Sequence, residues 1–188
     1  VSDIAKENNL KLHIDGARIF NATTALNISL SNLIKNVDSV TFCLSKGLAC
    51  PIGSVVCGSK DFIDSARRMR KALGGGMRQA GIIAAAGLIA INKLEKQITE
   101  DHDNAQLLAD GLDQIDGLYI DKNKVKTNIM YFELKSDTVS SKHLLKEMQN
   151  QGILFFEVSP NRYRLVTHYG ITESDIIYTL EAFQKVLS

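Results

Sequence analysis

Two apolar segments in the first third of the chain each end at a charged residue. Asp15 follows residues 10–14, and Lys46 follows residues 39–44 within Ser45-Lys46-Gly47. A lysine is costly to bury, so its position directly behind a core-type strand needs a reason. A lysine held in a partly dry site loses affinity for its proton and becomes a nucleophile. The pattern therefore favours an enzyme in which Asp15 serves the ring or carbonyl that Lys46 captures.

Helical and extended segments alternate over the first 60 residues. Such alternation predicts an α/β layer with a largely parallel sheet. In open sheets of this kind ligands gather at the carboxyl ends of the strands, where we expect both Asp15 and Lys46. The expected elements are a helix end up to residue 9, strands at 10–14, 39–44 and 53–57, and a helical turn at 31–34.

The next segment, up to about residue 116, is expected to be helical. Asp61 can cap a helix over 62–73, which Gly74-Gly75-Gly76 ends. A long apolar helix is expected over 77–96. Its most hydrophobic part, about a dozen residues, is too short for a membrane span and is typical of a buried helix. A third helix, at 100–114, has its apolar residues on one side.

The pattern changes after residue 117, where strands predominate. The order of elements predicts a small α+β domain, with two helices on one face of an antiparallel sheet. We therefore expect two domains, residues 1–105 and 106–188. The expected elements of the second are strands at 128–134, 153–156 and 163–167, a helix at 140–150, and a helix at 172–187 that starts with the capping sequence Thr172-Glu173-Ser174-Asp175.

Composition excludes several classes of protein. The 188 residues carry a net charge of +1, so neither nucleic acid nor a membrane is an expected partner. The first ten residues lack the order of a secretory signal. No histidine is spaced to complete a zinc site with Cys43, Cys50 and Cys57, so we expect no metal. We expect the three cysteines to be buried or half-buried free thiols in a reducing compartment, the cytoplasm. The chain starts without Met and within a helix, and we expect it to be a piece of a longer protein.

The charged strand ends also have plain structural interpretations. Asp15 can hold a protonated pyridine nitrogen while Arg18 reaches a ring oxygen, or Asp15 can cap the next helix in an ion pair with Arg18. Ser45 can bond a phosphate beside Lys46, and Gly47 lets a ligand approach the backbone. The alternative is a lysine at a strand end that is simply solvated.

Two further basic segments leave similar alternatives open. A glycine-rich turn that opens a helix is an anion site, and Arg78 in the first turn of that helix is unfavourable unless an anion is present. A capping glycine run beside a solvated basic face, residues 67–71, explains the same pattern. A P-loop is excluded, because its motif is missing. Arg164 can clamp a carboxylate or be a charge on an edge strand, and His168 is as suited to a surface as to catalysis.

Four motifs together resemble the low-specificity L-threonine aldolases, pyridoxal-phosphate enzymes of the aspartate-aminotransferase fold type. They are His-x-Asp-Gly-Ala-Arg, Ser-Lys-Gly-Leu, Leu-Gly-Gly-Gly-Met-Arg-Gln and Arg-Leu-Val-Thr-His, at residues 13–18, 45–48, 73–79 and 164–168. The last two are specific to that family, whereas the first two indicate only the fold type. The resemblance implies the C-terminal part of a fold-type-I large domain, with a mostly parallel sheet, followed by a small α+β domain.

The resemblance also implies a role for each candidate residue. Lys46 would bind the cofactor aldehyde covalently, Asp15 would pair with the pyridinium nitrogen, and Arg18 with the ring hydroxyl oxygen. The other expected site residues are Ser45, Lys71 and Arg78 for the cofactor phosphate, the last two often reaching a neighbouring subunit, and Arg164 for the substrate carboxylate.

The activity implied is retro-aldol cleavage of L-threonine and L-allo-threonine to glycine and acetaldehyde, through an external aldimine, in a homotetramer. The glycine-containing phosphate turn and the ring-stacking histidine of that family are not among these 188 residues. Two alternatives therefore stay open. One is another fold-type-I enzyme, a β-eliminating amino-acid lyase or a transaminase. The other is an inactive truncated fragment.

Overall fold

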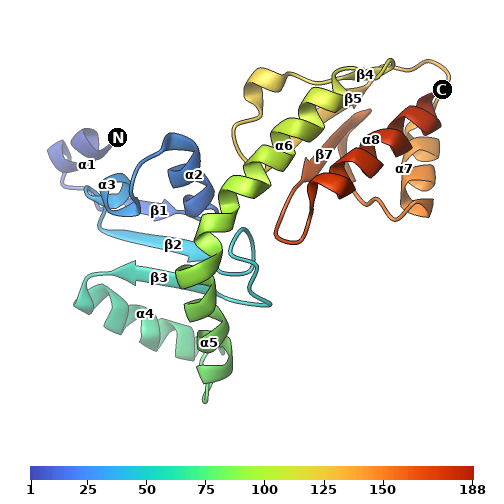
Figure 1. Cartoon of the computed structure of the whole chain (residues 1–188). Coiled ribbons are helices and arrows are strands. Elements are labelled where there is room, and N and C mark those ends of the chain that lie inside the picture. Colours follow the sequence, from blue (N-terminus) through green and yellow to red (C-terminus); the bar gives the residue numbers. More distant parts are fainter. The chain divides into compact units, whose positions relative to one another are not determined.

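The computed structural model describes residues 1–188, except for the side chain of Lys96. It consists of two compact units, Val1–Lys96 and Gln97–Ser188 (Figure 1). The boundary between these units precedes the expected domain boundary at 105/106. The assignment of the two domains stays a prediction.

The first unit contains a three-stranded sheet. Strands β1 (His13–Asp15) and β2 (Ser39–Cys43) are parallel, and β3 (Ser54–Gly58) returns antiparallel beside β2 (Figure 1). The prediction of a largely parallel sheet is therefore met between β1 and β2 only. The ten residues from 44 to 53 contain no helix, and a parallel crossover needs a dozen or more residues.

Helix α4 of the first unit begins and ends at identifiable signals. The expected cap Asp61 is wrong. Asp61 lies in the first turn of α4, and Ser59 is the cap, with Oγ accepting from the Phe62 N–H at 3.3 Å. The helix ends before the glycine run as predicted, and Gly74 has a φ of 82° that favours glycine. The helices are α1 (Ser2–Glu7), α2 (Ile19–Leu26), α3 (Leu30–Ile34), α4 (Lys60–Ala72) and α5 (Gly81–Ile89).

The apolar helix expected over 77–96 is shorter and more exposed than predicted. α5 passes into a π-helical turn, η1 (Ala90–Leu94), and a 3₁₀ turn, η2 (Glu95–Gln97). Gly87 packs against Leu44, yet Ile82 is 83% and Leu88 64% exposed. The prediction of burial is therefore wrong, because this unit covers only one side of α5. No helix among the described residues combines the length and the apolar character needed to cross a membrane.

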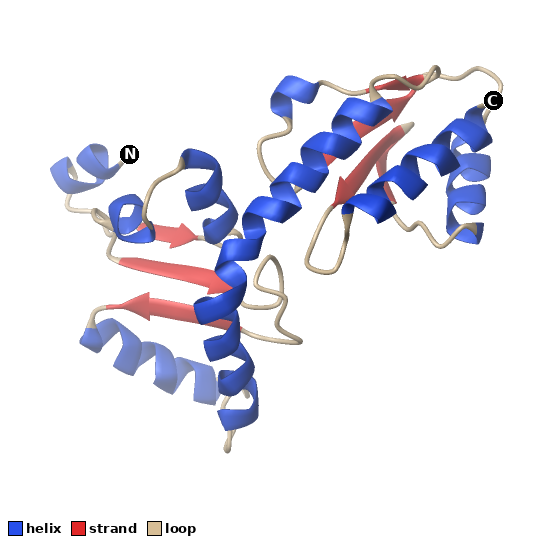
Figure 2. Ribbon diagram, in the orientation of Figure 1, coloured by secondary structure: helices blue, strands red, loops and turns tan.

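The second unit is an antiparallel sheet with helices on one face, as predicted (Figure 2). A third helix, α6, joins the two expected ones, and its Leu108 and Leu112 are buried in the same core. The sheet order is β4-β5-β7-β6. Its elements are α6 (Ile98–Leu112), β4 (Leu118–Tyr119), η3 (Lys122–Lys124), β5 (Ile129–Leu134), α7 (Ser141–Asn150), β6 (Phe156–Ser159), β7 (Arg162–Val166) and α8 (Glu173–Leu187).

The two faces of this second sheet differ in character. Phe132 and Tyr163 point into the core under the helices, with ring centroids 5.0 Å apart. On the other face Tyr131 is 43% exposed, and the Arg162 guanidinium lies over its ring at 5.1 Å. The capping box predicted for α8 is confirmed, with Thr172 and Asp175 bonded reciprocally.

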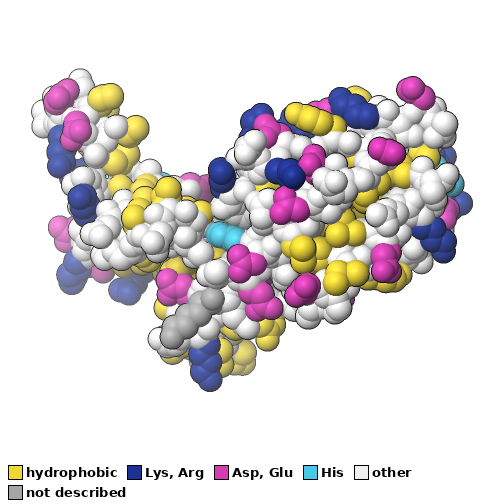
Figure 3. All heavy atoms as spheres, turned by 45° about the horizontal axis from the view of Figure 1, so that its top comes forward, with side chains coloured by type: hydrophobic (Ala, Val, Ile, Leu, Met, Phe, Trp, Pro, Cys, Tyr) yellow, Lys and Arg dark blue, Asp and Glu magenta, His cyan; other side chains and the backbone are white. Residues whose placement is uncertain are grey.

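Charged groups of both signs are interspersed over the surface. On the face that Figure 3 shows, Lys and Arg side chains alternate with Asp and Glu. This distribution agrees with the net charge of +1.

Candidate active site

Asp15 is the last residue of β1 and is exposed. Its Oδ1 accepts a hydrogen bond from the Ala17 N–H at 3.3 Å. The next residue, Gly16, is buried, and its N–H donates to the Thr41 carbonyl at 2.8 Å. A Cβ on Gly16 would lie 2.7 Å from that carbonyl oxygen, so only glycine fits here. This close approach of the backbone holds Asp15 at the carboxyl end of β1.

Arg18 precedes α2 and is half-buried. Its Nε is buried without a hydrogen-bond partner among the described residues. Within the same part of the chain, Arg18 also forms no ion pair with Asp15. The structural interpretation, an ion pair between these two residues, is therefore not what this unit forms. A buried donor without a partner needs an explanation, and an acceptor from a ligand is one.

Lys46 lies in the loop that follows β2. The loop is anchored by Leu44, Leu48 and Cys50, which are buried, while Ser45 and Lys46 are exposed. The Leu44 N–H donates to the Gly53 carbonyl at 2.9 Å, and the Cys50 N–H to the Leu44 carbonyl at 3.0 Å. The partly dry lysine that the sequence predicts is therefore not formed by this unit alone.

Asp15 and Lys46 follow neighbouring parallel strands. β1 and β2 run in the same direction, with Asp15 opposite Thr41 in the register (Figure 1). Parallel strands have their carboxyl ends at the same edge of the sheet. The carboxyl ends of β1 and β2 therefore share one edge, with Asp15 at the end of β1 and Lys46 in the loop that follows β2.

Lys71 and Arg78 lie on either side of the glycine run, and both are exposed. The Lys71 stem crosses Gly76, whose Cβ would lie 2.5 Å from the Lys71 Cδ. Arg78 was expected in the first turn of a helix, and this is wrong, because α5 starts only at Gly81. Gln79 has a φ of 46°, in the left-handed region, so the helical conformation of α5 does not extend back to Arg78. Arg78 is therefore a loop residue.

Arg164 lies in the second unit, on a strand that is not an edge. β7 pairs with β5 and β6, and Arg164 is directly opposite Tyr131 and Phe156. The side chain is half-buried, and its Nε is buried without a hydrogen-bond partner among the described residues. The alternative of an edge-strand surface charge is therefore wrong.

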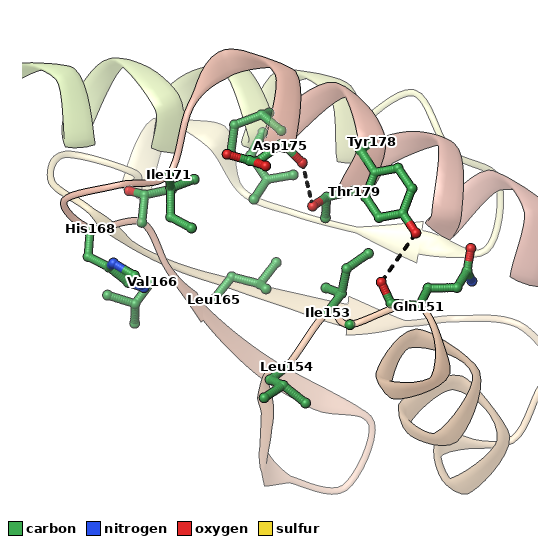
Figure 4. Close-up of a pocket in the computed structure, with 14 residues that line it drawn as sticks. Gln151, Ile153, Leu154, Leu165, Val166, His168, Ile171, Asp175, Tyr178 and Thr179 are labelled. Atoms are coloured by element: carbon green, nitrogen blue, oxygen red, sulfur yellow. Dashed lines mark hydrogen bonds between the residues drawn. The ribbon is translucent and has the colours of Figure 1, made fainter.

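A cavity of about 410 Å³ lies in the second unit, between β7, α8 and the loop at 151–154 (Figure 4). Its walls are mostly apolar, and some of its polar groups form hydrogen bonds with other groups of the protein. The Tyr178 hydroxyl donates to the Gln151 carbonyl at 3.2 Å, and the Thr179 hydroxyl to the Asp175 carbonyl at 2.7 Å. His168 lies at the rim, with Nδ1 2.9 Å from the Tyr169 carbonyl.

Asp101, in the first turn of α6, is a buried carboxyl that the sequence did not single out. Burial raises its pKa to about 6, the charge of His168 opposes the rise, and Glu100 adds to it. Between about pH 4 and pH 6, the Asp101 carboxyl therefore keeps its proton in the folded state, whereas it has lost the proton in the unfolded chain. Stability is expected to fall as the pH rises from about 4 to about 6.

Asp101→Asn is expected to remove this pH dependence, because an amide does not titrate. The variant should unfold with a free energy about 1–2 kcal/mol higher than wild type at pH 7.5, and no higher at pH 4. Urea unfolding at the two pH values measures the difference. Asp103→Asn is the control, since Asp103 is exposed on the same helix. An equal change in both variants would contradict the assignment.

The sequence pattern singled out Gly47 but not its neighbour in space. Asn21, on α2, is 2% exposed, and its Oδ1 lies 2.7 Å from the position that a Cβ on Gly47 would occupy. The signal available was an asparagine within an otherwise apolar helix face.

All three cysteines are free, and Cys57 is exposed, contrary to the expected burial. No group of His, Cys, Asp or Glu in the described part of the chain is arranged to hold a metal ion.

L-threonine aldolases of other organisms match all or nearly all of the chain. It is 44% identical over 188 residues to low-specificity L-threonine aldolase 1 of Arabidopsis thaliana, covering 100% of this chain and 52% of that protein. It is 38% identical over 174 residues to the low specificity L-threonine aldolase of Escherichia coli K12, covering 93% of this chain and 50% of that protein. The chain therefore spans about half the length of these relatives.

The fold and the family agree with these matches. The structure of a candidate L-allo-threonine aldolase from Listeria monocytogenes superimposes with a TM-score of 0.82 at 19% identity, covering 99% of this chain and 55% of that one. The fold is therefore that of a partial fold-type-I domain. The family model described as "Beta-eliminating lyase" matches residues 1–135. The chain belongs to the β-eliminating lyase family.

Proposed function

We propose that this chain takes part in the pyridoxal-phosphate-dependent cleavage of L-threonine and L-allo-threonine to glycine and acetaldehyde. The observation that carries the proposal is the shared edge of the parallel strands β1 and β2, which brings Asp15 and the Lys46 loop together. The names of the relatives support an aldolase over another activity of the family. A transaminase or a β-eliminating lyase is the less favoured alternative.

The residues present fit pyridoxal phosphate, the cofactor of this family. The buried Arg18 Nε lacks an acceptor among the described residues, and a cofactor ring oxygen would supply one. Gly16 lets the backbone approach closely beside Asp15. The exposed Lys46 amine is free to react with an aldehyde. These three features support a cofactor at this edge.

Each side chain has one task in this proposal. The bound cofactor supplies an electron sink for the pair released when the Cα–Cβ bond breaks. Lys46 would hold the cofactor through its side-chain amine. Asp15 would keep a proton on the ring nitrogen, and Arg18 would bond the ring oxygen. Ser45, Lys71 and Arg78 supply donors and positive charge for the phosphate, and Arg164 orients the substrate carboxylate.

The products of the reaction test the proposal. The protein is incubated with pyridoxal phosphate and L-threonine, and glycine and acetaldehyde are measured. Glycine and acetaldehyde in equal amounts are expected. Pyruvate and ammonia from serine, without glycine from threonine, would replace the aldolase by a β-eliminating lyase. Neither product, together with no uptake of the cofactor, would leave the chain as an inactive fragment.

We also propose that the protein assembles into a homo-oligomer, a tetramer as in the family it resembles. The support is α5, whose Ile82, Leu88 and Ile89 are more than half exposed without a charged residue in the helix. Exposed apolar surface of this kind marks an interface. Sedimentation equilibrium measures the assembly, and a monomer at all concentrations would contradict it.

The free thiols support a reducing, cytoplasmic location.

A further inference from the structure

The contact between Asn21 and Gly47 joins the two halves of the candidate site in the first unit. Asn21 lies three residues after Arg18, in the first turn of α2. Its side chain is buried, and its carboxamide oxygen lies 2.7 Å from the position of a Cβ on Gly47, the residue next to Lys46. A methyl group on Gly47 would therefore require the Asn21 carboxamide or the loop to shift.

Backbone hydrogen bonds and buried side chains also hold the Lys46 loop. The Cys50 N–H bonds back to the Leu44 carbonyl, and the Ala49 N–H to the Lys46 carbonyl at 2.9 Å. Ala49 has a φ of 53°, a conformation that costs energy for a residue with a Cβ. Such a strained backbone persists only where its surroundings fix it. The buried Asn21 side chain, which lies against Gly47, is part of those surroundings.

α2 also connects this contact to Asp15. The Ile19 N–H donates to the Gly16 carbonyl at 2.8 Å, and the Ala22 N–H to the Arg18 carbonyl at 3.2 Å. Gly16 is in turn bonded to Thr41 on β2. Asp15, Arg18 and Asn21 therefore belong to one hydrogen-bonded segment, which Asn21 brings against the backbone beside Lys46.

We propose that Asn21 is a positioning residue, which sets the Lys46 loop at a fixed height relative to Asp15 through its contact with Gly47. The chemical consequence rests on the proposed function. An amine and a carboxylate that act on one cofactor ring must be held within a fraction of an ångström of their working separation. Asn21 touches neither the cofactor nor the substrate in this account.

Two single variants and their combination test the contact. Gly47→Ala inserts a methyl group against the Asn21 oxygen and is expected to displace the loop. Asn21→Ala removes the oxygen and leaves the loop without its support. Covalent labelling of Lys46 by pyridoxal phosphate and borohydride, mapped by peptide mass spectrometry, should slow by about tenfold or more in Gly47→Ala, where the loop is displaced, and by less in Asn21→Ala. The double variant has room for the methyl group, and its labelling rate should recover to the level of Asn21→Ala or better.

A second readout does not depend on the cofactor. Hydrogen exchange of the amides at 44–50 should accelerate in Asn21→Ala and in Gly47→Ala, while the amides of β1, β2 and β3 keep their protection. Thr23→Ala is the matched control, since Thr23 is buried on the same helix and its hydroxyl donates to the Phe20 carbonyl, away from the loop. In that variant the loop amides and the Lys46 labelling should be unchanged.

Several results would overturn the proposal. One is equal acceleration of exchange throughout the first unit in Asn21→Ala, and another is a double variant no better than Gly47→Ala. If Asn21→Ala does not fold, Asn21→Ser and Gly47→Ala decide in its place. Failure of the wild-type chain to bind pyridoxal phosphate would count against the proposed function, while exchange at 44–50 would still decide the role of Asn21.

Discussion

Lys46→Ala is expected to abolish covalent uptake of pyridoxal phosphate by the chain. The cofactor aldehyde condenses with a primary amine, and alanine offers none. Lys46 is exposed in the loop that follows β2, at the sheet edge where β1 ends with Asp15, so it is the amine that we expect to meet a ring held by Asp15. The measurements are the near-visible absorption of the protein with the cofactor, and the mass of the Lys46 peptide after borohydride reduction. Both signals should fall to background.

Two comparisons separate this result from ordinary lysine labelling. Lys60→Ala removes an exposed lysine that pairs with Asp64 on α4, and it should take up the cofactor like wild type. Lys46→Arg keeps the positive charge without the reactive amine, and it should fail like the alanine variant. An absorption band of normal height in Lys46→Ala, with the adduct on Lys71, would move the site to the glycine run.

The fold of the second unit followed closely from alternation along its strands. In β5 the residues Met130, Phe132 and Leu134 are buried and Tyr131 is exposed, so one face of the pattern specified the core. Strand direction in the first unit is different in kind. Val55 and Val56 indicate an apolar strand, but they do not indicate that β3 runs antiparallel to β2. The direction follows from the ten residues between β2 and β3, which are too few and contain no helix for a parallel crossover.

The candidate site was predictable where backbone pattern alone fixes it. Asp15 ends β1 and Lys46 lies in the loop after the parallel strand β2, so their common edge follows from topology. The loop conformation before α5 was not predictable, because Gln79 in a left-handed conformation leaves no mark in the sequence. Burial of α5 was also mispredicted. An apolar composition indicates that a helix packs against other apolar surface. The first unit provides such packing at Gly87 but leaves Ile82 and Leu88 exposed.

Phe132→Ala is expected to be the most destabilising single change in the second unit. Phe132 is 1% exposed, and its ring contacts Phe155, Tyr163 and Phe183, with centroids 5.0–5.6 Å away. Removing such a ring loses its burial energy and leaves a cavity among three aromatic neighbours, at a cost of about 3–5 kcal/mol. Domains of this size are stable by only about 5–15 kcal/mol, so the change removes a large share of the total.

The opposite face of the same sheet provides the matched control. Phe156, on β6, is 70% exposed, and its replacement by alanine leaves the aromatic core intact. Urea unfolding followed by far-UV circular dichroism should show a large shift for Phe132→Ala and a change within about 0.5 kcal/mol for Phe156→Ala. Equal shifts would mean that the helix-free face is buried in solution. In that case the surface around Arg164 would be covered by another part of the assembly, and the stability of this unit would depend on protein concentration.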